Sequence, residues 1–174
     1  MSDPRLDPYV LSVRLDAATQ QRFDDLRRAH FPPGRTAVAA HVTVFHALPP
    51  ANDTPDAVSA VLGELAPSPS VVTVTGVRSL GRGVAYTLEA PGVAVVRARL
   101  VREFGDRLTP QDSQPWRPHV TVQNKVTPQA ARALLAELSA AFVPFDAVAV
   151  GLALWRYRGG PWEAVREFPF RGES

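Results

Sequence analysis

A four-residue motif that contains a histidine and a threonine occurs twice in this chain. The sequence His-Val-Thr-Val at residues 41–44 returns 78 residues later at residues 119–122, and the whole chain has only four histidines. A single copy would be typical of an ordinary valine-rich strand, because short motifs often match by chance. The repetition instead indicates two equivalent functional positions.

Two histidines and two threonines directed at one point would suit a phosphate group. One imidazole can take a proton from a nucleophile while the other gives a proton to a leaving oxygen. Histidine can fill both roles near neutral pH. The threonine hydroxyls can donate hydrogen bonds to the non-bridging oxygens, where negative charge develops. The motif pair therefore predicts acid–base chemistry on a phosphodiester.

The first copy is predicted to be a β-strand, because Val and Thr favour strands and the residues alternate in polarity. Alternate residues of a strand share one face. His41, Thr43 and Phe45 should therefore point toward a polar cleft. His46 should lie on the opposite face with the valines, as a partly buried histidine.

The second copy follows the same alternation. His119 and Thr121 should share a face with Gln123, and Lys125 belongs to that face if the strand stays regular so far. Pro118 can begin such a strand, where no ladder hydrogen bond is needed. Two such strands, related by an approximate two-fold axis, would bring both pairs to one cleft.

The composition restricts the classes of protein. Residues 1–174 fit one domain. The absence of Cys excludes disulfides, thiolate zinc sites and a Cys nucleophile. No apolar run has transmembrane length, and the polar first residues are no signal peptide, so we expect a cytoplasmic protein with no membrane partner. A net charge of +2 argues against a general binder of duplex DNA. Lys125 is the only Lys; the excess of Arg suits phosphate recognition but fits a composition bias equally well.

Helices and strands alternate along the chain, as expected for an α+β protein. Hydrophobic spacing and capping residues such as Asp16 predict four helices, at about 17–29, 55–65, 93–107 and 127–142. Strands are expected at 9–15, 41–48, 71–77, 84–89, 119–122, 145–157 and 162–170, with hairpins after the second and fourth helices. Each half contains helix, motif strand, helix and hairpin, with little identity outside the motif.

This arrangement resembles the two-histidine (2H) phosphoesterase superfamily, in its 2′-5′ RNA ligase-like or RNA 2′,3′-cyclic phosphodiesterase branch. The motifs His41 to Val44 and Pro118 to Val122 carry the resemblance, which extends over the element order of the whole chain. It implies a bilobal α+β fold, with two antiparallel sheets related by a pseudo-two-fold around a central cleft and helices outside. It also implies hydrolysis of a terminal 2′,3′-cyclic phosphate on RNA or a nucleotide, typically to the 2′-phosphate, without a metal or other cofactor. We expect a monomer.

The resemblance assigns catalysis to His41, Thr43, His119 and Thr121. We take His119 as the base that activates water and His41 as the acid that protonates the departing 3′ oxygen, although the near symmetry of the pair leaves this order open. Each role is worth about 10² to 10⁴ in rate.

Four further residues are candidates for substrate binding. Phe45 and Trp116 can stack on a base, but Phe45 would equally floor the cleft and Trp116 fits better as a loop anchor. Arg117 is a candidate phosphate clamp. Relatives often carry a basic residue soon after the second motif, and here Lys125 comes third, after Gln123 and Asn124. Three other arginines stay open as cleft residues: Arg14, Arg156 and Arg158.

Three other functions compete with this interpretation. The same site could join or cleave 2′-5′ RNA linkages, or it could bind nucleotides or RNA without catalysis. A metal site formed by His41, His46 and His119 is disfavoured, because His41 and His46 should lie on opposite faces with no clear carboxylate partner.

Overall fold

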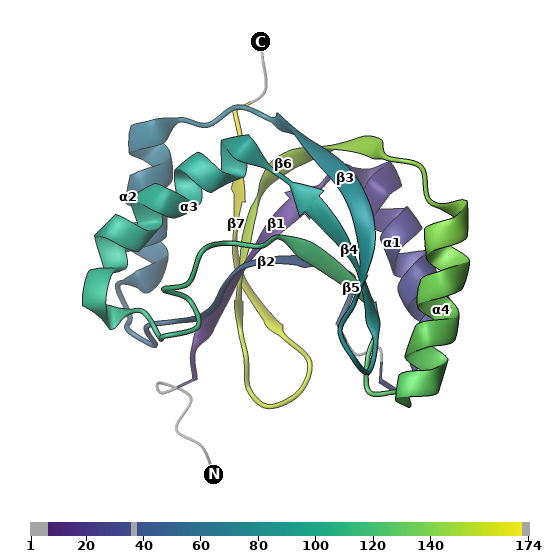
Figure 1. The fold of residues 1–174 in the computed structure, drawn as a ribbon. Coiled ribbons are helices and arrows are strands. Elements are labelled where there is room, and N and C mark those ends of the chain that lie inside the picture. The colour runs from purple at the N-terminus through teal and green to yellow at the C-terminus, as the bar shows by residue number, and fades with distance from the viewer. Residues whose placement is uncertain (1–6, 36–37, 172–174) are drawn as a thin grey trace.

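The structure, a computed structural model, describes residues 7–35 and 38–171. Four α-helices accompany seven strands in this part of the chain, in an order that alternates as the sequence predicts (Figure 1). The elements are β1 (Tyr9–Leu15), α1 (Ala17–His30), β2 (Val42–Leu48), α2 (Thr54–Leu65), β3 (Ser70–Ser79), β4 (Val84–Glu89), α3 (Pro91–Phe104), β5 (His119–Gln123), α4 (Pro128–Ala141), β6 (Phe145–Arg156) and β7 (Glu163–Pro169).

The local signals in the sequence explain most of these boundaries. Asp16 caps α1, because its carboxylate accepts the backbone N–H and the hydroxyl of Thr19. Thr127 caps α4 in the same way through the N–H of Ala130. Asp53, at the start of α2, makes no side-chain cap. The third helix begins at Pro91, a residue suited to the first turn, and a short 3₁₀ turn follows it at Gly105–Arg107.

The strands form one continuous antiparallel sheet, so the prediction of two separate sheets is wrong. The order is β1-β2-β5-β4-β3-β6-β7, and β1 also pairs with β6, which closes six strands into a ring. The long β6 makes this possible. It pairs with β1 along one edge and with β3 and then β7 along the other. The narrowest connection of the ring is a single pair between β2 and β5.

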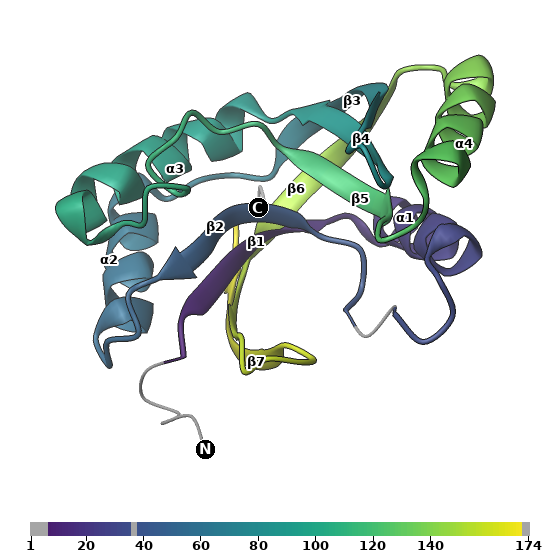
Figure 2. The same cartoon turned by 60° about the horizontal axis from the view of Figure 1, so that its bottom comes forward.

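The helices lie outside this ring in two pairs (Figures 1 and 2). Helices α1 and α4 cover the part of the sheet formed by β3, β4 and β5. The contact between the rings of Phe23 on α1 and Tyr86 on β4, 5.5 Å between centroids, belongs to this layer. Helices α2 and α3 pack on each other and over β2 and β7. Each motif strand therefore lies under a helix from the other half of the chain.

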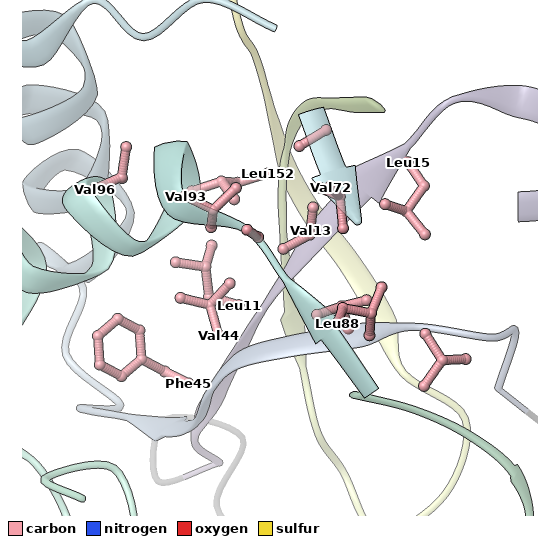
Figure 3. Close-up of a cluster of buried hydrophobic side chains, with 14 of the residues drawn as sticks. Leu11, Val13, Leu15, Val44, Phe45, Val72, Leu88, Val93, Val96 and Leu152 are labelled. Carbon is pink, nitrogen blue, oxygen red and sulfur yellow. The ribbon is translucent and has the colours of Figure 1, made fainter. Parts of the chain in front are cut away.

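The hydrophobic core fills the space between α3 and the strands (Figure 3). Leu11, Val44, Phe45, Val93 and Leu152 are at most 1% exposed. Each such side chain contributes about 1.5–3 kcal/mol by its removal from water. Because Val44 directly follows Thr43, this core holds the first motif strand from behind. None of the helices in the described residues has the length and apolar character needed to cross a membrane.

Candidate active site

The two motif strands lie side by side, as the sequence predicts. Val42 pairs with Val120 in antiparallel orientation. Continued by one residue each way, this register puts Thr43 opposite His119 and His41 opposite Thr121. The pairing is symmetric about the two valines, so the two motifs are related by a local two-fold axis.

All four polar side chains of the motifs belong to one face of the sheet. His41, Thr43, His119 and Thr121 are half-buried, whereas the valines of both motifs are fully buried on the other side. Thr43 and His119 line a common pocket. The two histidines occupy diagonal positions, for which Cα atoms are about 7–8 Å apart. That spacing leaves room for a phosphate between the rings.

Both histidine rings are fixed in the same way. The Nδ1–H of His41 donates to the carbonyl oxygen of Ala39 at 2.8 Å, and the Nδ1–H of His119 donates to that of Arg117 at 2.9 Å. Each carbonyl belongs to the residue two positions earlier, so the local two-fold is kept. A carbonyl can only accept a hydrogen bond, which leaves Nε2 of each ring free to accept or donate a proton in the cleft.

Each motif strand contains an extra residue just beyond its threonine. Ser12 pairs with Thr43 but Leu11 pairs with Phe45, so β2 has one residue more than β1 at Val44. Such a bulge turns the following side chains to the opposite faces. Phe45 is accordingly 0% exposed, against the prediction that it lines the cleft, and cannot stack on a base. His46 is exposed rather than partly buried.

The same shift occurs in β5. Ala85 pairs with Thr121 but Val84 pairs with Gln123. Gln123 is therefore 7% exposed instead of lying in the cleft. The strand ends there, and Lys125 follows in a turn with a φ of 60°. The prediction that Lys125 shares the His119 face is wrong, because the strand is neither regular nor long enough.

Two buried arginines tie each motif to the other half of the chain. Arg27 of α1 donates to the carbonyl oxygens of Val38, 2.9 Å away, and Thr121, 2.8 Å away. Arg97 of α3 donates to the carbonyl oxygen of Val44 at 3.2 Å and to two carbonyl oxygens of the loop before the second motif. Arg27 thus connects the loop before the first motif to the strand of the second motif. Arg97 connects the loop before the second motif to the strand of the first.

The loop before the second motif is also anchored by an acid. Asp112 is 1% exposed and accepts the backbone N–H groups of His46 and Ala47, both at 2.8 Å. Burial alone would raise the pKa of this carboxyl, but these bonds and the His46 ring lower it overall. His46 is held here, 3.3 Å from Asp112. Within the described residues, no group of three or more His, Cys, Asp or Glu side chains is arranged to hold a metal ion.

His41 lies in a more enclosed position than the symmetry of the motifs implies. The ring of Trp162 packs against it, with 4.5 Å between centroids. Burial lowers the pKa of His41 from 6.5 to about 4. The hydrogen bond to Ala39 opposes this shift, while the charge of Arg27 and the neighbouring histidines add to it. At neutral pH His41 is therefore unprotonated, with Nε2 as an acceptor.

The predicted binding residues near the second motif have different positions. The indole N–H of Trp116 donates to the carbonyl oxygen of Thr43 at 2.9 Å, and its ring packs on the core. Trp116 is thus mainly a loop anchor. Arg117 is exposed and lines two pockets next to His119.

Two pockets of similar size open beside the histidine pair. The first, about 560 Å³, adjoins His41 and contains Trp155 and Trp162; we call it the Trp pocket. The second, about 590 Å³, adjoins His119 and contains Arg78 and Arg117; we call it the Arg pocket. Of the arginines left open by the sequence, Arg14 lines the Trp pocket.

Sequence reasoning missed several of these residues. Trp162 and Arg78 come from hairpins whose position relative to the motifs depends on strand pairing. Arg27 and Arg97 carried a weak signal, because each is a charged residue on an otherwise apolar, inward-facing side of its helix. Arg27 shares that side of α1 with Phe23, and Arg97 shares that side of α3 with Val93, Val96 and Leu100.

A comparison with family models gives one match. The model described as the 2′-5′ RNA ligase superfamily matches residues 15–161 of the chain. In a separate comparison, no curated protein sequence matches this chain.

Several solved structures share the fold at low sequence identity. E. coli LigT complexed with 3′-AMP is 17% identical, with a TM-score of 0.64 over 94% of this chain and 98% of that one. A protein of Thermus thermophilus is 20% identical, with a TM-score of 0.62 over 96% and 100%. Usb1 of Kluyveromyces marxianus with uridine monophosphate is 14% identical, with a TM-score of 0.51 over 95% and 99%.

Proposed function

Because the chain belongs to the 2′-5′ RNA ligase superfamily of 2H phosphoesterases, we propose that it hydrolyses a terminal 2′,3′-cyclic phosphate on RNA or a nucleotide. The observation that carries the proposal is the symmetric pair of histidines, each with Nδ1 fixed and Nε2 free on one face of the sheet. Related structures contain 3′-AMP and uridine monophosphate, ligands of the same chemical class.

His41 is the better candidate for the general base. A base must be unprotonated before the reaction, and the pKa of about 4 keeps His41 neutral at physiological pH. His119 then acts as the acid. This assignment reverses the one expected from the resemblance, because the enclosure of His41 by Trp162 breaks the symmetry of the pair.

The reaction then consists of one displacement at phosphorus and two proton transfers. Nε2 of His41 takes a proton from water as the water oxygen bonds to phosphorus. The bond from phosphorus to the 3′ oxygen breaks, and Nε2 of His119 gives its proton to that oxygen. The product is a 2′-phosphate with a free 3′ hydroxyl, and proton exchange with solvent restores both rings. No metal ion takes part in these steps.

The threonines stabilise the transition state. Among the described residues neither hydroxyl has a hydrogen-bond partner, so both are available to the substrate. Thr43 and Thr121 lie opposite the two histidines across the strand pair, where their hydroxyls can donate to the non-bridging oxygens. Removing one donor aimed at such an oxygen raises the activation free energy by about 2.7–4 kcal/mol.

The test is incubation with adenosine 2′,3′-cyclic phosphate in excess EDTA. Ring opening by the wild type, lost in His41→Ala and in His119→Ala but kept in His30→Ala, would support the proposal. His30 is a matched control at the end of α1, away from the cleft. Activity that survives the loss of either motif histidine would refute the mechanism. Binding without turnover would indicate a nucleotide-binding protein, and transfer to a 5′ hydroxyl instead of water would indicate ligation.

A further inference from the structure

The two pockets beside the histidines differ in charge. The Trp pocket contains two carboxylates, Asp24 and Glu167, and one cation, Arg14, which pairs with Glu167 at 3.4 Å. The Arg pocket contains Arg78 and Arg117 and one carboxylate. The two pockets therefore favour different parts of a substrate whose cyclic phosphate lies between the histidines.

The Trp pocket is suited to a nucleobase. Trp162 offers an aromatic ring next to His41, and Trp155 lies behind it at 6.1 Å between centroids. Asp24 uses one oxygen to accept the N–H of Ala40 at 2.8 Å, and Gln20 donates both to Asp24 and to Ala40. The second Asp24 oxygen and the Gln20 carbonyl have no partner among the described residues. They can accept hydrogen bonds from the exocyclic amino group of a base, and the Asp24 carboxylate would repel a phosphate.

The Arg pocket is suited to a phosphate. Arg78 on β3 pairs with Ala85, which in turn pairs with Thr121, so Arg78 continues the catalytic face of the sheet. Arg117 approaches from the loop before β5. Both are exposed, and within the described residues neither guanidinium has an ion-pair or hydrogen-bond partner. A guanidinium can hold a phosphate through two parallel hydrogen bonds. Glu89, which also lines this pocket, is the opposing charge.

The geometry of ribose matches this division. The base is attached to C1′, beside the 2′ oxygen, and the 5′ side of the chain leaves from C4′, beside the 3′ oxygen. A cyclic phosphate held between the histidines therefore has the base on one side and the preceding phosphate on the other.

We propose that the terminal base occupies the Trp pocket and the preceding phosphate occupies the Arg pocket, which makes Arg78 and Arg117 specificity residues for oligonucleotide ends. This inference rests on the proposed function. It places the 3′ oxygen beside His119, which donates the proton as the bond from phosphorus to that oxygen breaks, while His41 takes the proton of the water that bonds to phosphorus. The product is the 2′-phosphate.

The experiment compares two substrates that differ by one upstream nucleotide. They are adenosine 2′,3′-cyclic phosphate and the dinucleotide ApA ending in the same cyclic phosphate. The wild type should prefer the dinucleotide in kcat/KM. Arg78→Gln and Arg117→Gln should each lower kcat/KM for the dinucleotide by about tenfold, as expected for one lost hydrogen bond between charged groups. Neither should change the value for the mononucleotide by more than about twofold.

Arg82→Gln is the matched control. Arg82 lies at the tip of the same hairpin as Arg78, and its guanidinium donates to the carbonyl oxygen of Val126 outside the pocket. This variant should treat both substrates as the wild type does. Trp162→Ala should lower kcat/KM more for adenosine 2′,3′-cyclic phosphate than for ribose 2′,3′-cyclic phosphate without a base, because loss of the ring next to His41 affects both substrates and loss of stacking only the first.

Two results would overturn the inference. One is equal loss on both substrates in the arginine variants, and the other is a wild type without preference for the dinucleotide. Binding of the 2′-phosphate products, followed by tryptophan fluorescence, separates this inference from the function. If neither substrate is turned over but the dinucleotide product binds more tightly through Arg78 and Arg117, the pocket assignment stands and the proposed hydrolysis falls.

Discussion

The low pKa of His41 makes the free energy of unfolding depend on pH. Folding lowers this pKa from the ordinary value of 6.5 to about 4, so the unfolded chain binds the proton more readily. The difference between the two values corresponds to about 3 kcal/mol. Above about pH 7 His41 is unprotonated in both states and costs the native state nothing. As the pH falls from 6.5 to 4, up to about 3 kcal/mol of the free energy of unfolding is lost.

The measurement is urea unfolding of the wild type and His41→Gln between pH 7.5 and pH 4. Other groups titrate in both proteins, so their contributions cancel in the difference between the two free energies. That difference should move by about 3 kcal/mol in favour of His41→Gln as the pH falls. In the background of Trp162→Ala, where the ring that encloses His41 is gone, the same substitution should produce a smaller change.

The pH dependence of catalysis offers a second readout of the same group. If His41 is the base, kcat/KM should stay high down to about pH 4 and fall below it, as the ring becomes protonated. A difference in unfolding free energy that stays constant with pH would refute the enclosure of His41. An acid limb well above pH 4 would contradict its role as the base.

Three other substitutions test the site and its supports. Thr43→Val or Thr121→Val should lower kcat by about 10² with little change in the unfolding midpoint, since each removes only a hydroxyl aimed at the phosphate; steady-state kinetics and thermal melts check this. Asp112→Ala should destabilise the fold by about 2–4 kcal/mol in urea unfolding, because two backbone N–H groups of β2 lose a buried ionic partner. Gly83→Ala should cost about 1–3 kcal/mol in the same assay, as its new Cβ would meet the backbone carbonyl of Gln123.

Local patterns in the sequence predicted correctly that His41, Thr43, His119 and Thr121 lie on one face. The alternation of His41, Val42 and Thr43, and of the second motif, depends only on the period of a strand. The element order and the cap at Asp16 likewise follow from neighbours in the chain. These features needed no knowledge of distant contacts.

The bulges set the limit of that reasoning. All four of these side chains were placed by extending the alternation: Phe45, His46, Gln123 and Lys125. An extra residue in the strand displaces the first three from the predicted face, and Lys125 lies beyond the end of β5 in a turn. Nothing in Val44 itself marks the bulge. Its carbonyl oxygen is satisfied by Arg97, 53 residues further along the chain, so the bulge is a tertiary feature.

The closure of the sheet and the asymmetry of the histidines also depend on distant contacts. The resemblance implied two sheets, but β6 is long enough to pair with β1, β3 and β7 and joins them into one. Trp162 reaches His41 only because the hairpin of β6 and β7 extends past the sheet (Figure 1). The sequence places Trp162 121 positions after His41 and gives no sign of their contact.

The packing of each motif strand under a helix from the other half of the chain has a consequence for synthesis on the ribosome. Arg27 lies in the first helix after β1, yet its partner Thr121 is 94 residues away, and β1 itself pairs along its length with β6. Contacts of such sequence separation close late and make folding slow. An N-terminal fragment would leave β1 with one open edge and α1 without β4 and β5 to cover. The cleft at the two motif strands can therefore assemble only after nearly the whole chain has left the exit tunnel, and we expect a truncated product to lack the proposed hydrolysis.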